Sequence, residues 1–338
     1  MRFFLFLTLL LCYSSLSAKT FTLASYNVQN LFDLKKSGLE YTDYIPNTKA
    51  KWNKKNYKTK ILHLSNTIHD LNPDIIALQE IESDYALKDL QYVLLYLESS
   101  YPYRAITTCK ETTVHTAILS KFPITKQNEI IVNPDDRIRS ILDITLDIEG
   151  KDFRVFVNHW KSKRGSESKR IPYGKALSTL IKKIPSDRDY VIVGDLNSNY
   201  NEYRTFKKSQ KFNDTKGITA INHFLQTIDN DRMNSFSYFK KSSKKLHYNL
   251  WMELEYKYRW SYLYRGRNNS LDHIIIPQSL TDGLGVEYLK SSFQRFMPEY
   301  LVKKRKIFRW KFSKRGGIKH HIGKGYSDHI PIIAKFSY

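Results

Sequence analysis

The chain has 338 residues, of which 41% are hydrophobic and 26% are charged, and this composition excludes a disordered or low-complexity protein. Its 55 Lys and Arg against 33 Asp and Glu give a net charge of +22, which favours a polyanionic partner such as nucleic acid or an acidic membrane surface. With 2 cysteines no disulfide framework can form, so the fold must be held by a hydrophobic core.

The first 18 residues have the layout of a secretory signal peptide. Arg2 gives a short positive start, an apolar run continues to Cys12, and small or polar residues follow up to Ala18. This apolar run is too short to span a bilayer. The alternative, a lipoprotein signal ending at Cys12, is disfavoured because the bulky Leu11 stands where a small residue is needed. We therefore expect cleavage near Ala18 and a periplasmic or secreted protein, in which Cys109 is a free, buried thiol.

Short apolar runs predict buried strands along the rest of the chain. They cover residues 21–26, 75–78, 116–119, 141–146, 153–157, 190–193, 271–276 and 330–336. Two of these runs flank Glu149-Gly150, which predicts a hairpin. Apolar residues spaced by three and four predict helices over residues 57–70, 84–97 and 174–184.

These strands and helices do not alternate strictly, which favours an α/β (α+β) protein with mixed sheets over a purely parallel, doubly wound sheet. The polar, Lys-rich stretch 199–250 predicts a long insertion of loops and short helices. No Pro/Gly/Ser-rich linker and no internal repeat divides the sequence. We therefore expect residues 1–18 to be the signal peptide and residues 19–338 to form one catalytic domain.

Polar side chains stand where the apolar runs end or begin. They are Asn27 and Asn30, Glu80, Asn158 and His159, Asp195 and Asn197, Asp272, and Asp328 and His329. Each of these residues alone is most simply a turn former or a helix cap. Together they indicate a ligand site, because strand ends are where the loops of a layered α/β fold converge.

The residue types fit metal-assisted hydrolysis of a phosphodiester. Asp and Glu oxygens suit Mg²⁺, and the reaction needs a positioned base and a proton donor for the leaving oxygen. Zinc is disfavoured, because no Cys or His clusters have zinc-site spacing. A Gly-Lys-Ser/Thr phosphate loop and a Gly-x-Ser-x-Gly elbow are both absent from the sequence, which argues against nucleotide-triphosphate motors and serine hydrolases.

The sequence around these polar residues resembles the endonuclease/exonuclease/phosphatase (deoxyribonuclease I-like) superfamily. The matching segments, in the order of the family, are SYNVQNLF (25–32), IIALQEIE (75–82), VNHWKSKRG (157–165), VGDLN (193–197), LDHIII (271–276) and YSDHIPI (326–332). The Asn-His-Trp segment is similar to that of exported bacterial members commonly described as nucleases. The resemblance implies a four-layer α/β/β/α sandwich of two mixed β-sheets flanked by helices.

The resemblance also implies roles for individual residues. The metal ligands, for Mg²⁺ with Mn²⁺ or Ca²⁺ as substitutes, are Glu80, Asn27 and Asp328. The catalytic residues, which orient water, hold the phosphate or transfer protons, are His159, Asp195, Asn197, Asp272 and His329. The residues expected to reach the substrate are Asn30, Arg139, Lys161 and Arg164.

Other basic and aromatic residues have two interpretations each. The basic residues after His159, namely Lys161, Lys163, Arg164, Lys169 and Arg170, form either a solvated face or a grip on flanking phosphates. The run 303–315 alternates bases and aromatics, and hairpin packing is a simpler role for its rings than base stacking. The pair His320-His321 is expected to be structural or solvent-facing, because adjacent side chains on an extended segment point apart. His273 is expected to be structural, because relatives vary at the position after Asp272.

The leading hypothesis is an exported, Mg²⁺-dependent endonuclease that hydrolyses DNA, with RNA as a further nucleic-acid substrate. The alternative is a phosphodiesterase or phosphatase acting on a lipid head group or a small phosphorylated solute. A third hypothesis, a non-catalytic binding protein, is disfavoured because the six segments keep their chemically active residues. We expect a monomer with nucleic acid as substrate and no stable membrane insertion.

Overall fold

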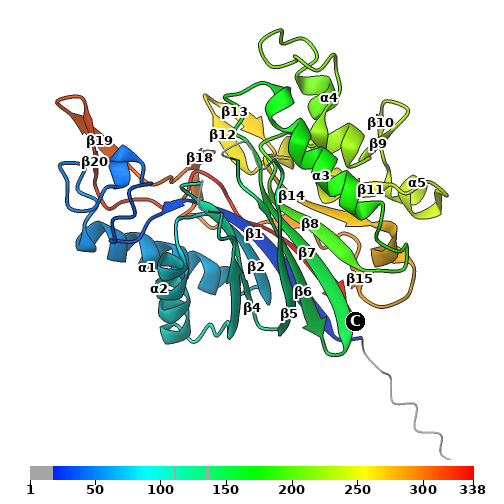
Figure 1. Cartoon of the computed structure of the whole chain (residues 1–338), viewed down its shortest axis with the longest axis horizontal. Coiled ribbons are helices and arrows are strands. Elements are labelled where there is room, and N and C mark those ends of the chain that lie inside the picture. The colour runs from blue at the N-terminus through cyan, green and yellow to red at the C-terminus, as the bar shows by residue number, and fades with distance from the viewer. Residues whose placement is uncertain (1–17, 110–111, 134–137) are drawn as a thin grey trace, which may run out of the picture.

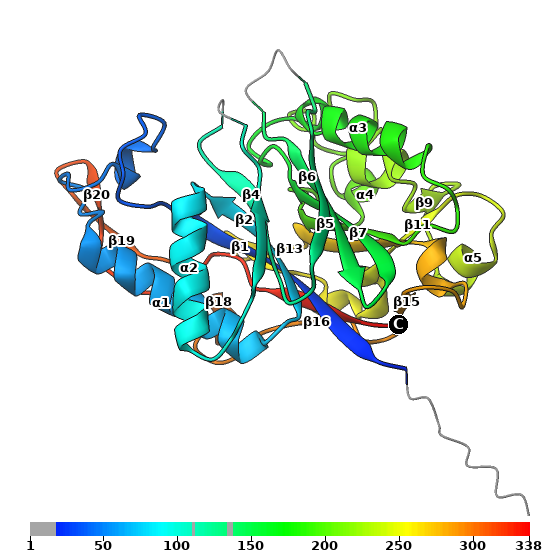
Figure 2. The same cartoon turned by 60° about the horizontal axis from the view of Figure 1, so that its bottom comes forward.

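The fold is a sandwich of two β-sheets that pack face to face, with helices on the outer faces (Figures 1 and 2). The computed structural model describes residues 18–109, 112–133 and 138–338. Both sheets are mixed, since β1 and β2 pair in parallel while β1 and β21 are antiparallel, and β7 and β8 are parallel while β8 and β14 are antiparallel. The predicted four-layer α/β/β/α arrangement is therefore confirmed.

The strand order of each sheet brings distant parts of the chain together. The first sheet has the order β15 (Glu287–Tyr288), β21 (Ile332–Ser337), β1 (Thr20–Leu31), β2 (Ile75–Ile81), β4 (His115–Ser120) and β3 (Tyr103–Ile106), and β16 (Gln294–Arg295) also pairs with β21. The second sheet has the order β11 (His247–Asn249), β14 (Asp272–Pro277), β8 (Tyr190–Asp195), β7 (Lys151–His159), β6 (Ile141–Ile148) and β5 (Ile124–Ile130).

The strands are apolar on both faces because each sheet is covered on both sides. Between the sheets lies a core that includes Leu23, Ile75, Val155, Val193 and Ile274. The outer face of the first sheet packs against α1 (Lys54–Leu71) and α2 (Asp84–Tyr96), and that of the second packs against α3 (Ile171–Ile181). This burial explains why continuous apolar runs, and not alternating ones, predicted the central strands.

The predicted strands and helices are all present, and the hairpin turn falls at Glu149 (φ 49°) and Gly150 (φ 92°) as expected. Of the strands in the two main sheets, the sequence-based prediction missed β3, β5, β11, β15 and β16. β5 is an edge strand whose residues are mostly exposed, so the sequence ITKQNEI lacks the apolar run that marks a buried strand.

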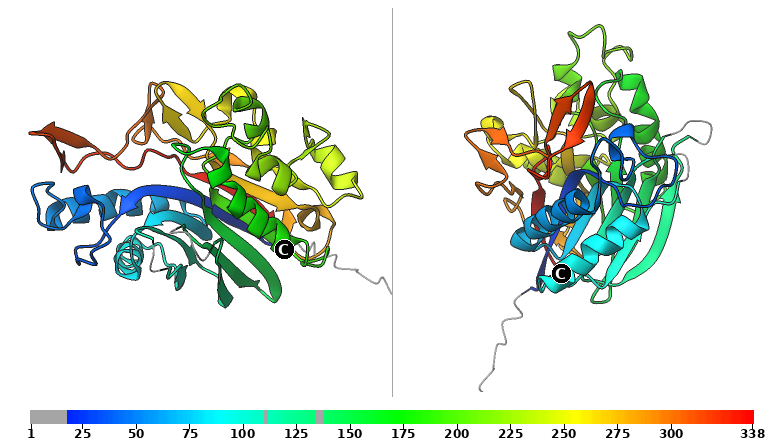
Figure 3. Two further views of the ribbon diagram at one scale, coloured as in Figure 1. Left: turned by 45° about the horizontal axis from the view of Figure 1, so that its top comes forward. Right: turned by 90° about the vertical axis from the view of Figure 1, so that its left-hand side faces the viewer.

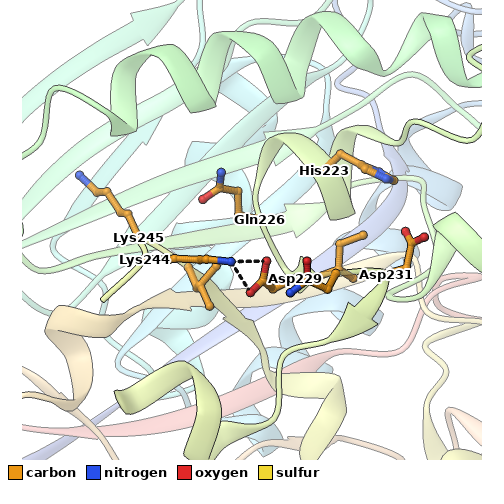
Figure 4. Close-up of a pocket in the computed structure, with 9 residues that line it drawn as sticks. His223, Gln226, Asp229, Asp231, Lys244 and Lys245 are labelled. Atoms are coloured by element: carbon orange, nitrogen blue, oxygen red, sulfur yellow. Dashed lines mark hydrogen bonds and ion pairs between the residues drawn. The ribbon is translucent and has the colours of Figure 1, made fainter. Parts of the chain in front are cut away.

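The insertion at 199–250 consists of loops and short elements, as predicted. They are α4 (Glu202–Thr205), a π-helical turn η3 (Ala220–Phe224), β9 (Ile228–Asp229), β10 (Arg232–Met233) and α5 (Phe236–Lys241). A pocket of about 640 Å³ lies in this insertion (Figure 4). The ion pair of Lys244 and Asp229 forms part of its wall, and none of the predicted site residues lines it.

Short hairpins lie outside the two main sheets. They are β12 (Tyr262–Tyr264) with β13 (Arg267–Asn269), β17 (Val302–Lys303) with β18 (Lys306–Ile307), and β19 (Phe312–Arg315) with β20 (Ile318–His321). The β19–β20 hairpin extends away from the sandwich (Figure 3). Short 3₁₀ turns complete the described chain: η1 (Thr42–Tyr44), η2 (Glu167–Lys169), η4 (Leu250–Glu253), η5 (Tyr256–Tyr258) and η6 (Gln278–Thr281).

Several residues that were predicted to have structural roles are buried and hydrogen-bonded within the fold. Trp310 is fully buried and donates Nε1–H to His321 Nδ1 at 2.8 Å, while His321 Nε2 donates to the Asp43 carbonyl. Both nitrogens of His273 are also hydrogen-bonded within the core. Cys109 is free, but it is half-buried where a buried thiol was expected.

The predicted signal peptide falls almost entirely on residues 1–17, which lie outside the described part of the chain. Across the described ranges, we find no helix with the length and hydropathy needed to cross a bilayer.

Candidate active site

The polar strand ends of the two sheets meet at one place. On the second sheet, His159 lies directly opposite Asp195, which lies opposite Asp272, so the three side chains share one face. On the first sheet, Asn27 and Glu80 lie on the neighbouring strands β1 and β2. Asn27 joins the sheets, because its Nδ2 donates to Asp195 Oδ2 at 3.0 Å and to Glu80 Oε1 at 3.2 Å.

Glu80 is placed by a bulge in β2. Gln79 pairs with Thr116 and Ile81 pairs with His115, which leaves Glu80 as the extra residue between them. Its φ is 68°, a left-handed conformation that costs a non-glycine residue free energy. The bulge interrupts the regular alternation of side chains along β2 and redirects the Glu80 carboxylate. The Glu80 side chain is 21% exposed.

The Asn-His-Trp segment is held rigidly at the end of β7. The Asn158 amide donates to the carbonyls of Phe156 and Val193, and its Oδ1 accepts from Trp160 Nε1 at 2.9 Å. Gly194 (φ 125°) lies so close that a Cβ there would be 2.1 Å from the Asn158 carbonyl oxygen. Asn158 and Trp160 therefore position His159, a role that the sequence had not indicated for them.

His329 and Asp272 form a hydrogen-bonded pair, with His329 Nδ1 donating to Asp272 Oδ2 at 2.8 Å. The other ring nitrogen, Nε2, lies 3.9 Å from Asp195 Oδ2. Burial opposes a charge on His329, but the carboxylates of Asp272, Asp195 and Asp328 outweigh it and raise its pKa to about 10. His329 is therefore an imidazolium held in one orientation.

His159 approaches the same carboxylate from another direction. Its Nε2 lies 3.7 Å from Asp195 Oδ2 and 3.8 Å from Glu80 Oε1. Burial, with the positive charges of Arg139 and His329, lowers the pKa of His159 well below its ordinary value. The two histidines that face Asp195 thus differ in charge.

The carboxylates of the site are crowded. Burial raises the pKa of Asp195 to about 7, with Asp272 adding to the rise and His329 opposing it. Burial and the charge of Asp328 likewise raise the pKa of Glu80. A cation between Glu80 and Asp328 would relieve this repulsion.

Two sets of residues have the donor types of a metal site. The predicted pair, Glu80 and Asp328, is 21% and 19% exposed in its side chains, as suits a Mg²⁺ ion that keeps several waters, and Asp328 also has the exposed Arg309 guanidinium at 3.4 Å. The second set, Asp195, Asp272 and His329, has its ligand atoms within 4.8 Å of one another but is buried, and its His329–Asp272 contact is a hydrogen bond. A hard cation therefore fits Glu80 and Asp328 better.

The remaining predicted residues lie around this centre. The Asn27 amide nitrogen donates to the carboxylates of Glu80 and Asp195, while its Oδ1 accepts from the Gln29 backbone N–H. Asn27 therefore orients these two carboxylates. Its role as a metal ligand stays a prediction. The Asn197 backbone N–H donates to Asp195 Oδ1 at 2.8 Å. Asn30 has a φ of 60° in the irregular end of β1.

The predicted substrate-binding bases occupy different environments. Arg139 lies behind the histidine, because its guanidinium donates to the carbonyls of His159 and Trp160 at 2.9 and 2.8 Å. Lys161 and Arg164 are exposed on the loop that follows. Their contact with substrate stays a prediction.

Two of the other bases on this loop hold the loop itself. Lys163 forms an ion pair with Glu202 at 2.7 Å. Arg170 is buried, pairs with the buried Glu167 at 2.8 Å, and donates to loop carbonyls that include that of Gly165. The interpretation of Lys163 and Arg170 as phosphate-gripping residues is therefore wrong, because their charges are already neutralised within the fold.

Replacing Arg170 with methionine is expected to lower the free energy of unfolding by about 3 kcal/mol, because it leaves the buried Glu167 carboxylate unpaired. Urea denaturation followed by circular dichroism measures this change. Lys169→Met, at an exposed neighbouring position, is the matched control. Equal stability of the two variants would contradict the structural role of Arg170.

The family follows from a sequence comparison. The model of the endonuclease/exonuclease/phosphatase family matches residues 22–241, which is more than half of the chain. This chain belongs to that family. It is therefore a phosphoester hydrolase by family, of a kind whose chemistry depends on a divalent metal. A search of curated proteins returned no match.

Solved structures of the family share the fold. The humanised TDP2 of D. rerio has a TM-score of 0.56 at 13% identity, covering 94% of this chain and 99% of that one, and the D. rerio TDP2 complexed with single strand DNA product gives the same values. The mannosyl-6-phosphatase Bt3783 of Bacteroides thetaiotaomicron has a TM-score of 0.55 at 13% identity, covering 94% and 100%. At these identities the likeness establishes the fold alone.

Proposed function

We propose that this family member is an exported, Mg²⁺-dependent nuclease that hydrolyses phosphodiester bonds of DNA, with RNA as a further substrate. One observation carries the proposal: His159 and His329 both face Asp195 Oδ2, at 3.7 and 3.9 Å, beside Glu80. When a phosphodiester is hydrolysed, the leaving oxygen departs as an alkoxide that needs a proton, and the attacking water must lose one. Two positioned proton carriers therefore suit this reaction.

The roles of the residues follow from their contacts. Glu80 and Asp328 would hold the cation, which when bound neutralises charge on the phosphoryl oxygens. Asp195, fixed by the Asn27 amide and the Asn197 backbone N–H, orients the attacking water. Because Asp272 holds its Nδ1, His329 directs Nε2–H at a phosphate oxygen.

His159 completes the pair of proton carriers. Its Nε2 lies 3.8 Å from Glu80 Oε1 and 3.7 Å from Asp195 Oδ2, from where it can reach an attacking or leaving oxygen bound beside them. Asn197, whose amide nitrogen donates to the Trp160 carbonyl at 3.0 Å and whose backbone N–H donates to Asp195, is assigned to hold the phosphate. Together these residues satisfy the requirements for hydrolysis of a phosphate ester.

Charge supports nucleic acid as the substrate. The net charge of +22 attracts a polyanion to this chain. The D. rerio TDP2 structure complexed with single strand DNA product is consistent with this class of substrate. The equally similar mannosyl-6-phosphatase favours a second candidate, hydrolysis of a small phosphorylated solute.

Location outside the cytoplasm is part of the proposal and rests on the first 18 residues, with their short apolar run and small residues before the expected cleavage point. We propose that the mature enzyme acts in the periplasm or as a secreted protein.

The test uses purified residues 19–338 with plasmid, single-stranded DNA, RNA, sphingomyelin and sugar phosphates. Nucleic acid is expected to be cleaved with Mg²⁺, to be protected by EDTA and to be cleaved again when Mg²⁺ is restored. Binding in EDTA is expected to weaken linearly on a log–log plot against salt, because several phosphates are contacted. Turnover of a small phosphate ester with intact nucleic acid would replace the leading candidate by the second.

A further inference from the structure

The β12–β13 hairpin is attached directly to the catalytic centre. Tyr262 pairs with His329 in a backbone bridge, and their rings lie 4.7 Å apart between centroids. Burial and the charges of Asp328, Asp195 and Glu80 raise the pKa of Tyr262 to about 12, which agrees with its place beside the carboxylates. The sequence favoured strand packing over base stacking for the Tyr/Trp-rich stretch 248–264, which includes this tyrosine.

One face of the hairpin continues outward from His329. In the register of the two strands, Tyr262 lies opposite Asn269 and Tyr264 lies opposite Arg267, so these four side chains share a face. Tyr264 is two residues further along the strand, roughly 7 Å from Tyr262. Tyr264 is 53% exposed, and the Arg265 guanidinium lies 5.4 Å from its ring centroid. Arg267 is exposed beside it, so this end of the hairpin presents an aromatic ring and guanidinium groups to a ligand.

Positive charge surrounds this face. β12 lies beside β18, and the β17–β18 hairpin carries an exposed basic cluster made of Lys303, Lys304, Arg305 and Lys306. Arg309 follows it, with its guanidinium 3.4 Å from Asp328 and 56% of its side chain exposed. Gly325 (φ 87°) permits this placement, because a Cβ there would be 1.9 Å from the Arg309 carbonyl oxygen. The surroundings are complementary to a phosphate backbone.

We propose that the β12–β13 hairpin is a subsite for an unpaired nucleotide adjoining the scissile phosphate, with its base stacked on Tyr264 and its phosphate bound by Arg267. This inference rests on the proposed nuclease function. Stacking on an exposed ring requires a base free of its duplex partner, so the subsite selects single-stranded nucleic acid. A small phosphorylated solute held at His329 does not extend to Tyr264, and the hairpin therefore separates the two substrate classes.

The test compares two substrates of the same enzyme: a single-stranded oligonucleotide and the small diester bis(p-nitrophenyl) phosphate. In Tyr264→Ala and Arg267→Ala, kcat/KM for the oligonucleotide is expected to fall about 10-fold or more beyond any fall for the small diester. Tyr264→Phe is expected to retain the wild-type ratio because the ring remains.

The matched controls replace an exposed tyrosine and an exposed arginine that lie outside the β12–β13 hairpin. Tyr96→Ala replaces an 84% exposed tyrosine at the end of α2, and Arg188→Ala replaces an exposed arginine before β8. Fluorescence anisotropy with a labelled single-stranded oligonucleotide in EDTA gives a second readout, in which Tyr264→Ala is expected to bind about 10-fold more weakly than Tyr96→Ala.

Three outcomes would overturn the subsite. They are equal losses on the two substrates, unchanged oligonucleotide cleavage in both alanine variants, and a loss in Tyr264→Phe as large as that in Tyr264→Ala. Failure of the proposed function is seen in the wild-type enzyme instead, as intact oligonucleotide beside hydrolysed small diester. In that case the anisotropy comparison decides the subsite, and equal affinities of Tyr264→Ala and Tyr96→Ala reject it.

Discussion

Replacing His329 with alanine is expected to lower kcat/KM for phosphodiester hydrolysis roughly 1,000-fold, because it removes a charged donor fixed beside the phosphate. Asp272 holds the ring through the 2.8 Å hydrogen bond to Nδ1, and Asp272→Asn is expected to lower the rate in the same direction. Steady-state kinetics on an oligonucleotide at saturating Mg²⁺ measure both effects. The circular dichroism spectrum of each variant reports whether the fold is retained.

The matched control is His320→Ala, because His320 is a half-buried histidine on the remote β19–β20 hairpin. It is expected to keep wild-type kinetics. If His329→Ala kept more than about a tenth of the wild-type kcat/KM, the role of His329 as a charged donor to the phosphate would be excluded, since removing one such donor costs about 100-fold or more.

Glu80→Gln is expected to abolish Mg²⁺-dependent activity, with a fall of roughly 1,000-fold or more, while leaving the metal-free fold intact. Glutamine has the same shape and keeps the contact with Asn27, but it removes one negative charge from the cluster with Asp195 and Asp328. Isothermal titration measures the loss of Mg²⁺ affinity. In thermal unfolding, Mg²⁺ is expected to raise the Tm of the wild type and to leave that of the variant unchanged.

The control for Glu80→Gln is Glu98→Gln, an exposed glutamate with a similar positive φ of 62° just after α2. Glu98→Gln removes one carboxylate without changing the proposed metal site, so it shows the effect of the charge change alone. Wild-type Mg²⁺ affinity in Glu80→Gln would move the metal to another set of ligands, of which Asp195, Asp272 and His329 are the next candidates.

The sequence predicted the central strands well because a strand that is buried on both faces consists of a continuous apolar run, which can be recognised without knowing its neighbours. Runs such as 190–193 are apolar on both faces, and a strand covered on both sides leaves this mark whatever its neighbours are. β5 left no such mark, since an edge strand with mostly exposed side chains lacks a continuous apolar run. The strand order also could not be read locally, because pairing β1 with β2 and β21 joins segments far apart in the chain.

The polar residues at the strand ends could be identified from the sequence because they interrupt apolar runs, and the family resemblance gave them roles. Their convergence was decided by the tertiary structure. Asn27 and Asp195 are 168 positions apart, and their contact exists because two sheets pack face to face. The bulge that turns Glu80 toward the site is likewise a property of strand pairing.

The basic residues show most clearly what the sequence alone could not predict. By sequence alone the bases after His159 were equivalent, yet Arg170 is buried against Glu167 and Lys161 is exposed. The place of Tyr262 beside His329 was also seen only in the folded chain. The sequence by itself determined the reaction class, since the residue types and their order along the chain define the chemistry. The tertiary structure decided which charges remain free for a substrate, because this depends on the partner that folding brings to each one.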